Sequence, residues 1–272
     1  MTGASEWTGR VGRSWAAEWQ RTDRSFRHLT SRLLDRAGHG GFARCVDIGC
    51  GAGEVSLYLA RANPGSEVLG LDISESLLGT ATQRASGLTD LRFELADASR
   101  WTCPVEDAPD LLVSRHGVMF FDDPVAAFAH LRGQAGEGVR LVFSCFRERS
   151  DNIWAKELSA IVPGQAAPGN PRAPGPFAFG DASYVEAILQ QAGWHDVQFE
   201  PVDYPMIAGE GEGALDDATG YFLRIGPAAG AIAELDGELR EEAIGRLRTM
   251  LASYQAGGTI ALPAACWIVT AR

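Results

Sequence analysis

Three glycines at alternate positions, Gly49, Gly51 and Gly53, follow a short apolar run that contains Asp47. Glycine has no Cβ atom, so its backbone turns sharply and lets a ligand approach closely. After the loop, residues 54–62 place apolar side chains at helical spacing. A strand, a glycine turn and a helix N-terminus in this order predict a crevice lined by unpaired backbone N–H groups, which favour polar or anionic ligand groups.

The spacing of these glycines separates two classes of nucleotide-binding site. Dinucleotide-binding folds use G-x-G-x-x-G, whose last glycine lets the helix and strand pack closely beside the pyrophosphate. In this chain Glu54 occupies that last position. A carboxylate there is expected to repel a pyrophosphate, so the loop better suits an amino acid joined to a nucleoside without phosphate. S-adenosylmethionine (SAM) is such a ligand.

Acids also end two further strand-like runs, residues 67–74 and 91–98, at Asp72 and Asp97 respectively. In doubly wound folds the acid after the second strand accepts hydrogen bonds from ribose hydroxyls, and such charge-assisted bonds are strong. Each acid also has a simpler interpretation. Asp72 could cap the helix that begins near Ser74, and Asp97 could be an exposed loop carboxylate.

The stretch from Val46 to Gly53 resembles the first motif, (V/L)-D-(I/V/L)-G-x-G-x-G, of the class I SAM-dependent methyltransferases. The resemblance implies SAM as cofactor and S-adenosyl-L-homocysteine as its product. It also implies that Asp97 and the Ala98 N–H read the adenine while Ile73 lies against its ring. The predicted cofactor-binding residues are therefore Trp15, Asp47, Gly49, Cys50, Gly51, Gly53, Asp72, Ile73, Asp97, Ala98 and Ser114.

Residues 7–15 match the pattern W-x-G-x-x-G-x-x-W, which resembles the N-terminus of a bacterial subgroup of small-molecule methyltransferases. Two interpretations are open. The segment could be a lid that closes over the methionine end of the cofactor, with Trp15 and Arg13 nearest the ligand. Alternatively, it could be an amphipathic helix that continues through Phe26 and Leu33 and packs on the sheet.

The fourth predicted strand, residues 110–115, leads directly into His116. Ligands in open α/β sheets bind beyond the carboxyl ends of the strands, where strand order reverses. Methyl transfer depends mainly on positioning, but a histidine near neutral pKa could take a proton from a hydroxyl or amine acceptor. His116 is thus the candidate catalytic residue, with a pocket-wall role as the alternative. The resembled family more often has an aromatic residue here, so His116 departs from its pattern.

The order of elements, with a fifth strand at residues 139–146, predicts an α/β fold: a Rossmann-like seven-stranded mixed sheet whose last strand is antiparallel, with helices on both faces. We expect an N-terminal helical lid, a SAM-binding core that contains a loop-and-helix insertion near the active site, and a helical cap. Their predicted bounds are 1–43 for the lid, 44–204 and 259–272 for the core with its insertion at 147–180, and 205–258 for the cap. Cap residues that could face the acceptor are Tyr221, Phe222, Arg224 and Tyr254.

Composition limits the partners. The chain has 24 Lys and Arg against 35 Asp and Glu, a net charge of −11, which argues against nucleic acid because phosphate backbones bind clustered cations. A neutral, cationic or apolar small molecule fits this balance as methyl acceptor. The five cysteines contain no C-x-x-C pair, so we expect reduced core thiols and no metal.

No run approaches the roughly 18 apolar residues of a membrane-spanning helix, and the N-terminus, which carries Glu6, Arg10 and Arg13, is unlike a signal peptide. A cytoplasmic location is therefore expected. The sequence contains no internal repeat or heptad array, and it leaves the oligomeric state open.

These observations favour a SAM-dependent methyltransferase that moves a methyl group to an O, N or C atom of a small molecule. A non-catalytic SAM-binding or interaction protein remains an alternative, because positioning alone carries the chemistry and no obligatory nucleophile exists to be checked. An NAD(P)-dependent oxidoreductase shares the strand–glycine–helix–acid order, but Glu54 and Asp97 speak against it.

Overall fold

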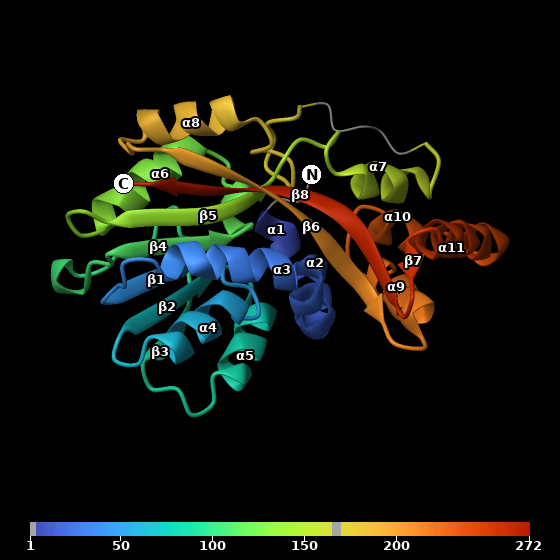
Figure 1. Ribbon diagram of the computed structural model, residues 1–272, viewed down its shortest axis with the longest axis horizontal. Helices are drawn as coiled ribbons and strands as arrows, with labels where there is room; N and C mark the ends of the chain where they lie inside the picture. The colour runs from blue at the N-terminus through green and yellow to red at the C-terminus, as the bar shows by residue number, and fades with distance from the viewer. Residues whose placement is uncertain (1–3, 165–169) are drawn as a thin grey trace.

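The computed structural model describes residues 4–164 and 170–272, which form a twisted sheet with helices on both faces (Figure 1). The strand order is β3-β2-β1-β4-β5-β8-β6, and β7 pairs with β8. The strands are β1 Arg44–Ile48, β2 Glu67–Asp72, β3 Leu91–Leu95, β4 Leu111–Arg115, β5 Arg140–Phe146, β6 Gln198–Glu210, β7 Gln255–Ala256 and β8 Thr259–Ala271. The α-helices are α1 Ala4–Trp7, α2 Arg10–Ala17, α3 Trp19–Gly38, α4 Glu54–Ala62, α5 Glu75–Arg84, α6 Pro124–Gln134, α7 Ile153–Ala160, α8 Ala182–Gln191, α9 Ala214–Phe222, α10 Ala229–Ala233 and α11 Gly237–Ala252.

The predicted mixed sheet is confirmed. β1, β2, β3, β4 and β5 pair in parallel, and β8 runs antiparallel between β5 and β6. The carboxyl ends of the parallel strands therefore meet at one edge of the sheet. Strand order reverses between β1 and β4, which places the glycine loop and the residues after β4 side by side.

Aromatic side chains on β5 show how the two faces are covered. Phe143 packs against Phe128 of α6, with ring centroids 5.7 Å apart, whereas Phe146 lies 6.2 Å from Phe26 of α3. Residues three apart on a strand point to opposite faces. The helices α3 and α6 thus cover opposite sides of β5, as the predicted fold requires.

Strand-like patterns in the sequence cover residues 195–204 and 264–271, but the last two long strands extend further than these ranges. β6 continues past Tyr204 to Glu210, β8 begins at Thr259, and the short β7 was not predicted. Prolines at 201, 205 and 263 lack the N–H that a central strand needs, so they obscured the pattern. The sheet tolerates them because β6 is an edge strand and β8 pairs with β5 only from Cys266 onward. The cap helices therefore start beyond residue 205, the predicted boundary.

The remaining segments agree with the predicted elements. Asp123 and Asp181 cap α6 and α8 through side-chain bonds to backbone N–H groups of the first turn. Three helices, α9, α10 and α11, fill the insertion between β6 and β8. The predicted insertion at 147–180 includes residues 165–169, and the predicted lid includes residues 1–3; both stretches lie outside the described residues.

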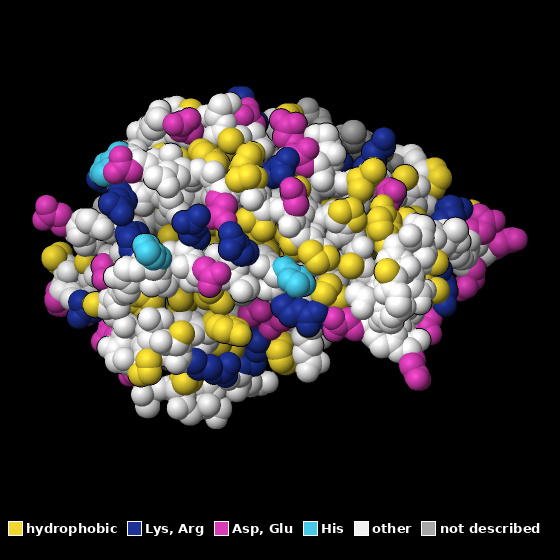
Figure 2. All heavy atoms as spheres, viewed as in Figure 1, with side chains coloured by type: hydrophobic (Ala, Val, Ile, Leu, Met, Phe, Trp, Pro, Cys, Tyr) yellow, Lys and Arg dark blue, Asp and Glu magenta, His cyan; other side chains and the backbone are white. Residues whose placement is uncertain are grey.

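Charged side chains of both signs are mixed across the face in Figure 2, and acidic ones gather at the end formed by α11. Exposed α11 acids include Glu238, Glu241 and Glu242. Within residues 4–164 and 170–272, no helix is both long enough and apolar enough to cross a membrane.

The two turns at the point of strand reversal are held together by Ser114. Its Oγ donates to the Ile48 carbonyl at 2.7 Å and accepts the Gly117 N–H at 3.1 Å. Gly49 lies so close to Gly117 that a Cβ atom on Gly49 would sit 2.8 Å from the Gly117 Cα. These two hydrogen bonds and this close contact fix the glycine loop relative to the residues that follow β4.

We predict that Ser114→Ala lowers the free energy of unfolding by about 1–3 kcal/mol, because a buried carbonyl and a partly buried N–H lose their partner. Ser144 is the matched control: it lies on the neighbouring strand β5, is equally buried, and its Oγ has no hydrogen-bond partner among the described residues. Ser144→Ala should be neutral or stabilising. Urea unfolding measures the free energy of unfolding of both variants. Equal losses of stability would contradict the role of the Ser114 hydrogen bonds in holding the two turns together.

Candidate functional site

A cavity of about 1640 Å³ opens beyond the carboxyl ends of the parallel strands. All predicted site residues except Gly53 and Ser114 line it. Those that line it are Trp15, Asp47, Gly49, Cys50, Gly51, Asp72, Ile73, Asp97, Ala98 and His116. A ligand pocket for one drug-sized molecule usually measures about 300–1,000 Å³. The cavity is therefore large enough for two ligands side by side.

Each glycine of the loop has a left-handed backbone, with φ of 65° at Gly49, 56° at Gly51 and 85° at Gly53. A Cβ on Gly51 would meet no atom within 4 Å, so this part of the loop faces open space. A Cβ on Gly53 would lie 3.0 Å from both Ala81 and Phe93. Gly51 thus leaves room for a ligand, whereas Gly53 allows close packing of the loop against α5 and β3.

Asp72, at the end of β2, is buried and braces the glycine loop. Its Oδ2 accepts the Gly51 N–H at 2.8 Å, and its Oδ1 accepts the Ser74 N–H at 2.8 Å. Burial raises the pKa of Asp72, while these backbone hydrogen bonds act in the opposite direction. A carboxylate has about four acceptor positions, so Asp72 keeps capacity for ligand hydroxyls.

Asp97 and Ala98 follow β3 at the rim of the cavity. Asp97 is exposed, and its Oδ1 accepts the Ser99 N–H at 2.9 Å and the Ser99 hydroxyl at 2.7 Å. Ala98 is buried, and Ile73 after β2 is half-buried. The predicted adenine-reading residues and the ring-supporting residue therefore lie in the same cavity.

Asp47 is a buried carboxylate beside the glycine loop. Its Oδ2 accepts the Ser56 hydroxyl at 2.6 Å, but its Oδ1 has no hydrogen-bond partner in the described part of the chain. Burial raises the pKa of Asp47 to about 6, although the bond from Ser56 opposes the shift. An unsatisfied buried acceptor is costly, so the site suits a ligand that brings an N–H donor, such as the amino group of SAM.

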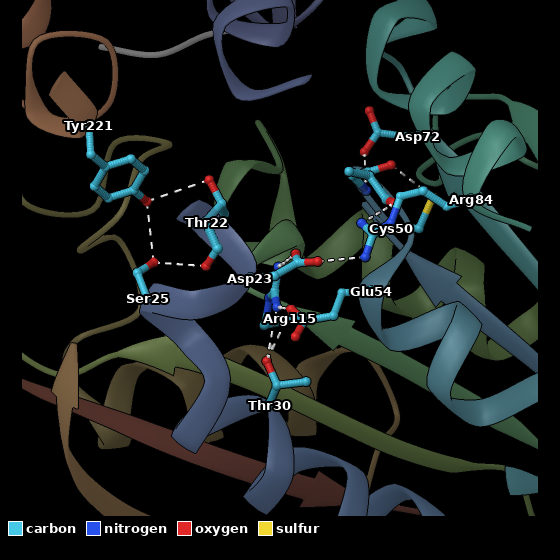
Figure 3. A network of polar contacts seen from close by, with 12 residues as sticks. Thr22, Asp23, Ser25, Thr30, Cys50, Glu54, Asp72, Arg84, Arg115 and Tyr221 are labelled. Atoms are coloured by element: carbon cyan, nitrogen blue, oxygen red, sulfur yellow. Dashed lines mark hydrogen bonds and ion pairs between the residues drawn. The ribbon is translucent and has the colours of Figure 1, made fainter. Parts of the chain in front are cut away.

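A network of charged side chains joins α3 to the cavity wall (Figure 3). Asp23 of α3 lies 2.5 Å from Arg84 of α5 and 3.9 Å from Arg115, the last residue of β4. Arg115 also donates to Thr30 at 2.9 Å and pairs with Glu54. Burial raises the pKa of Asp23, and the two arginines partly offset that shift.

This network was not predicted, because its members are far apart in the sequence and match no motif. It also corrects the expectation for Glu54. The Glu54 carboxylate is paired with Arg115 and does not line the cavity, so it does not repel a ligand in the way the sequence argument supposed. Arg84 further donates to the Ala52 carbonyl at 2.7 Å, which ties the glycine loop to the same network.

The N-terminal helices lie over the cavity. Trp7 packs edge-on against Trp15, at 5.4 Å, and against Phe120, at 5.1 Å. A Cβ on Gly12 would lie 2.3 Å from the Ser74 Oγ, so α2 sits directly on the turn after β2. Trp15 is half-buried in this contact. The tryptophan pattern therefore places aromatic rings at the cavity, while α3 packs on the sheet, so both interpretations of the N-terminal segment stay open.

His116 has a left-handed backbone, with φ of 65°, and its ring stacks on Phe146 at 4.3 Å. Its Nε2 lies 3.9 Å from the Cys266 Sγ, and its buried Nδ1 has no partner within the described residues. Burial, with a smaller contribution from Arg115, lowers the pKa of His116 to about 3. The imidazole is thus neutral at pH 7, and no carboxylate in the described part of the chain pairs with it to stabilise its charged form.

Three of the four cap candidates line the cavity. They are Tyr221, Phe222 and Arg224. The fourth, Tyr254, does not line it; its hydroxyl donates to Glu157 at 2.6 Å instead. No group of three or more His, Cys, Asp and Glu side chains that could hold a metal ion occurs in residues 4–164 and 170–272.

Known proteins share the sequence of the core. The model of a family described as a methyltransferase domain matches residues 45–134. A trans-aconitate 2-methyltransferase of Delftia acidovorans is 29% identical over 75% of this chain and 71% of its own length. A malonyl-[acyl-carrier protein] O-methyltransferase of Bacillus cytotoxicus is 28% identical, over 46% of this chain and 42% of that protein. The two alignments thus span 71% and 42% of the relatives' own lengths.

Solved structures share the fold. The YcgJ protein of Bacillus subtilis superposes with a TM-score of 0.59 at 15% identity, over 90% of this chain and 97% of that one. A Haemonchus contortus N-methyltransferase, solved with S-adenosylhomocysteine, gives a TM-score of 0.54 at 15% identity, over 95% of this chain and 56% of that one.

The site therefore agrees with the comparisons. Its glycine loop and strand-end acids lie within the residues that the methyltransferase family model matches. The residues present also fit SAM, since Gly51 leaves space for it and Asp47 offers an unsatisfied acceptor. Residues 45–134 thus match a methyltransferase domain, and the comparisons support SAM-dependent methylation of a small molecule as the activity of this chain.

Proposed function

We propose that this methyltransferase transfers the methyl group to a carboxylate oxygen of a small organic acid. SAM supplies a methyl group that its sulfonium already activates. The protein must therefore hold the cofactor and a nucleophile in line and exclude water. The observation that carries the proposal is the environment of His116, because this histidine, the candidate general base, is unsuited to that role.

For the cofactor, the proposed roles follow the strand ends. Asp47 and the glycine loop hold the amino-acid end, since Asp47 has a buried acceptor to satisfy. Asp72 accepts from the ribose hydroxyls with its remaining acceptor positions. Asp97 and the Ala98 N–H bind the adenine at the rim. Gly53 and Ser114, which do not line the cavity, shape the loop without touching the ligand.

For the acceptor, the state of His116 favours a group that is already deprotonated. An imidazole whose pKa is about 3 is a weak proton acceptor, and the neighbouring Arg115 disfavours its charged form. A carboxylate needs no base at neutral pH. The relatives' names point the same way, because aconitate and a malonyl group both derive from carboxylic acids. In this proposal His116 is a wall of the pocket, stacked on Phe146.

The proposal differs from what the net charge indicated, namely a neutral, cationic or apolar acceptor. Net charge describes mainly the surface, whereas Arg149 and Lys156 line the cavity. The N-terminal segment and the helices α9 to α11 form a lid and a cap on either side of the acceptor space. We also propose a cytoplasmic location and no nucleic-acid partner, since all five cysteines are free thiols and the chain is acidic.

Asp72→Asn should weaken S-adenosyl-L-homocysteine binding at least tenfold, because an amide N–H₂ replaces an oxygen that accepts hydrogen bonds from ribose. Asp122→Asn is the control, since Asp122 is an exposed carboxylate that lines the same cavity away from the glycine loop. Isothermal titration calorimetry measures both affinities. Equal affinities for the two variants would remove Asp72 from the ribose site.

Methyl transfer from radiolabelled SAM should yield base-labile methyl esters with carboxylic acids in a panel that also contains phenols and amines. Ester hydrolysis releases labelled methanol, whereas ethers and N-methyl groups survive the same treatment. Label found only in phenol or amine products would contradict the proposed acceptor class.

His116 should also make stability depend on pH. The pKa of His116 is about 3 in the folded state and 6.5 in the unfolded state. Between these two pH values the unfolded state therefore binds a proton that the folded state does not bind. The contribution of the neutral histidine to the free energy of unfolding is complete above pH 6.5 and is lost as the pH falls toward 3. Between pH 7 and pH 5 the wild type should lose up to about 2 kcal/mol more than His116→Asn. Asparagine tolerates the left-handed backbone.

Urea unfolding at both pH values gives this difference. The opposite effect of Asp47, whose raised pKa favours the folded state as pH falls, is the same in both proteins and cancels. An identical loss of stability in wild type and variant would show that His116 titrates normally in the folded protein.

A further inference from the structure

Aromatic rings form a continuous wall from His116 into the acceptor space. His116 stacks on Phe146 at 4.3 Å, and Phe146 contacts Phe177 at 5.7 Å and Trp154 at 5.4 Å. Phe177 and Trp154 are themselves 6.0 Å apart, and all four residues line the cavity. Such a surface favours a flat apolar molecule, because aromatic rings stack face to face with an offset or edge to face.

Arg149 lies at the far end of this wall. The centre of its guanidinium is 5.6 Å from the centroid of the Phe177 ring. Its Nη2 donates to the Ala155 carbonyl at 3.2 Å and to the Ser159 hydroxyl at 2.5 Å. The donors on Nε and Nη1 have no acceptor in residues 4–164 and 170–272. Part of the guanidinium fork is therefore available to a ligand.

Arg149 also lacks a counter-charge. Two half-buried arginines line the cavity, Arg115 and Arg149. Arg115 has Glu54 and Asp23 as partners, whereas no carboxylate of the described residues lies within 4 Å of Arg149. Taking a charge partly out of water without a partner costs free energy. An anionic ligand group would remove that cost and match the geometry of the fork.

We propose that Arg149 binds an anionic group of the methyl acceptor, distinct from the reacting carboxylate and joined to it by a flat apolar body that lies on the wall. The acceptor class is thus an amphiphilic organic anion with charged groups at both ends. This inference rests on the proposed function, because it takes the reacting group to lie beside His116. The cavity volume, which exceeds the space that one ligand needs, accommodates such a molecule next to the cofactor.

A pair of fluorescent dyes tests the proposal without knowledge of the natural acceptor. 8-Anilinonaphthalene-1-sulfonate carries an anionic sulfonate, and N-phenyl-1-naphthylamine has the same rings without it. Both are titrated into protein saturated with S-adenosyl-L-homocysteine. The wild type should bind the anionic dye more tightly than the neutral one. Arg149→Gln should weaken the anionic dye roughly tenfold and leave the neutral dye unchanged, because only the charge-assisted bonds are lost.

Three further variants distinguish the effect of the Arg149 charge from the effect of the aromatic wall and from a general effect on folding. Arg149→Lys keeps the charge and should restore part of the preference for the anionic dye. Phe177→Ala removes part of the wall and should weaken both dyes. Arg172→Gln removes an exposed cavity arginine, stacked on Tyr184 at 4.3 Å, and should change neither. Cofactor-product affinity, measured by calorimetry, should be the same in all variants.

The proposal is overturned if the wild type does not prefer the anionic dye, if Arg149→Gln binds both dyes as the wild type does, or if Arg172→Gln loses as much affinity as Arg149→Gln. Failure of the wild type to bind S-adenosyl-L-homocysteine would instead contradict the proposed function. The two failures are thus measured separately.

Discussion

The close contact between the turn after β1 and the turn after β4 is the constraint on which the site depends. Gly49 and Gly117 approach each other so closely that neither could carry a side chain without displacing the other. Ser114 holds the two turns together by hydrogen bonds to both. Because the turns are fixed, Asp47, Asp72 and His116 face one cavity from three different strand ends.

Unsatisfied polar groups in this cavity indicate what it should bind. The Asp47 Oδ1 has no donor near it, and Arg149 has no carboxylate near it, among the residues that the structure describes. By contrast, Arg115, which also lines the cavity, is paired with Glu54 and hydrogen-bonded to Thr30. Paired charges of this kind hold α3 and the glycine loop in place, whereas the unpaired ones are available to ligands. The site thus combines a structural network with separate binding groups.

The sequence predicted what depends on local spacing. The glycine loop and the acids at the ends of β2 and β3 follow from short patterns of residue type, and the mixed sheet follows from the order of the elements along the chain. Pairings between distant residues were not predictable, and Asp23 with Arg84 and Arg115 is the main example. The extension of β6 was obscured by its prolines. The sequence left both a base and a pocket-wall role open for His116, and it could not indicate that burial against Phe146, beside Arg115, lowers the pKa of this histidine.

The most direct test of the account compares the pH dependence of two affinities, for S-adenosyl-L-homocysteine and for adenosine, which lacks the amino-acid end. Asp47 is proposed to bind the amino group, and its pKa of about 6 means that it becomes protonated between pH 7 and pH 5. Calorimetry should show S-adenosyl-L-homocysteine losing roughly tenfold more affinity than adenosine over this interval. The same pH dependence for both ligands, or no binding of S-adenosyl-L-homocysteine at pH 7, would contradict the account.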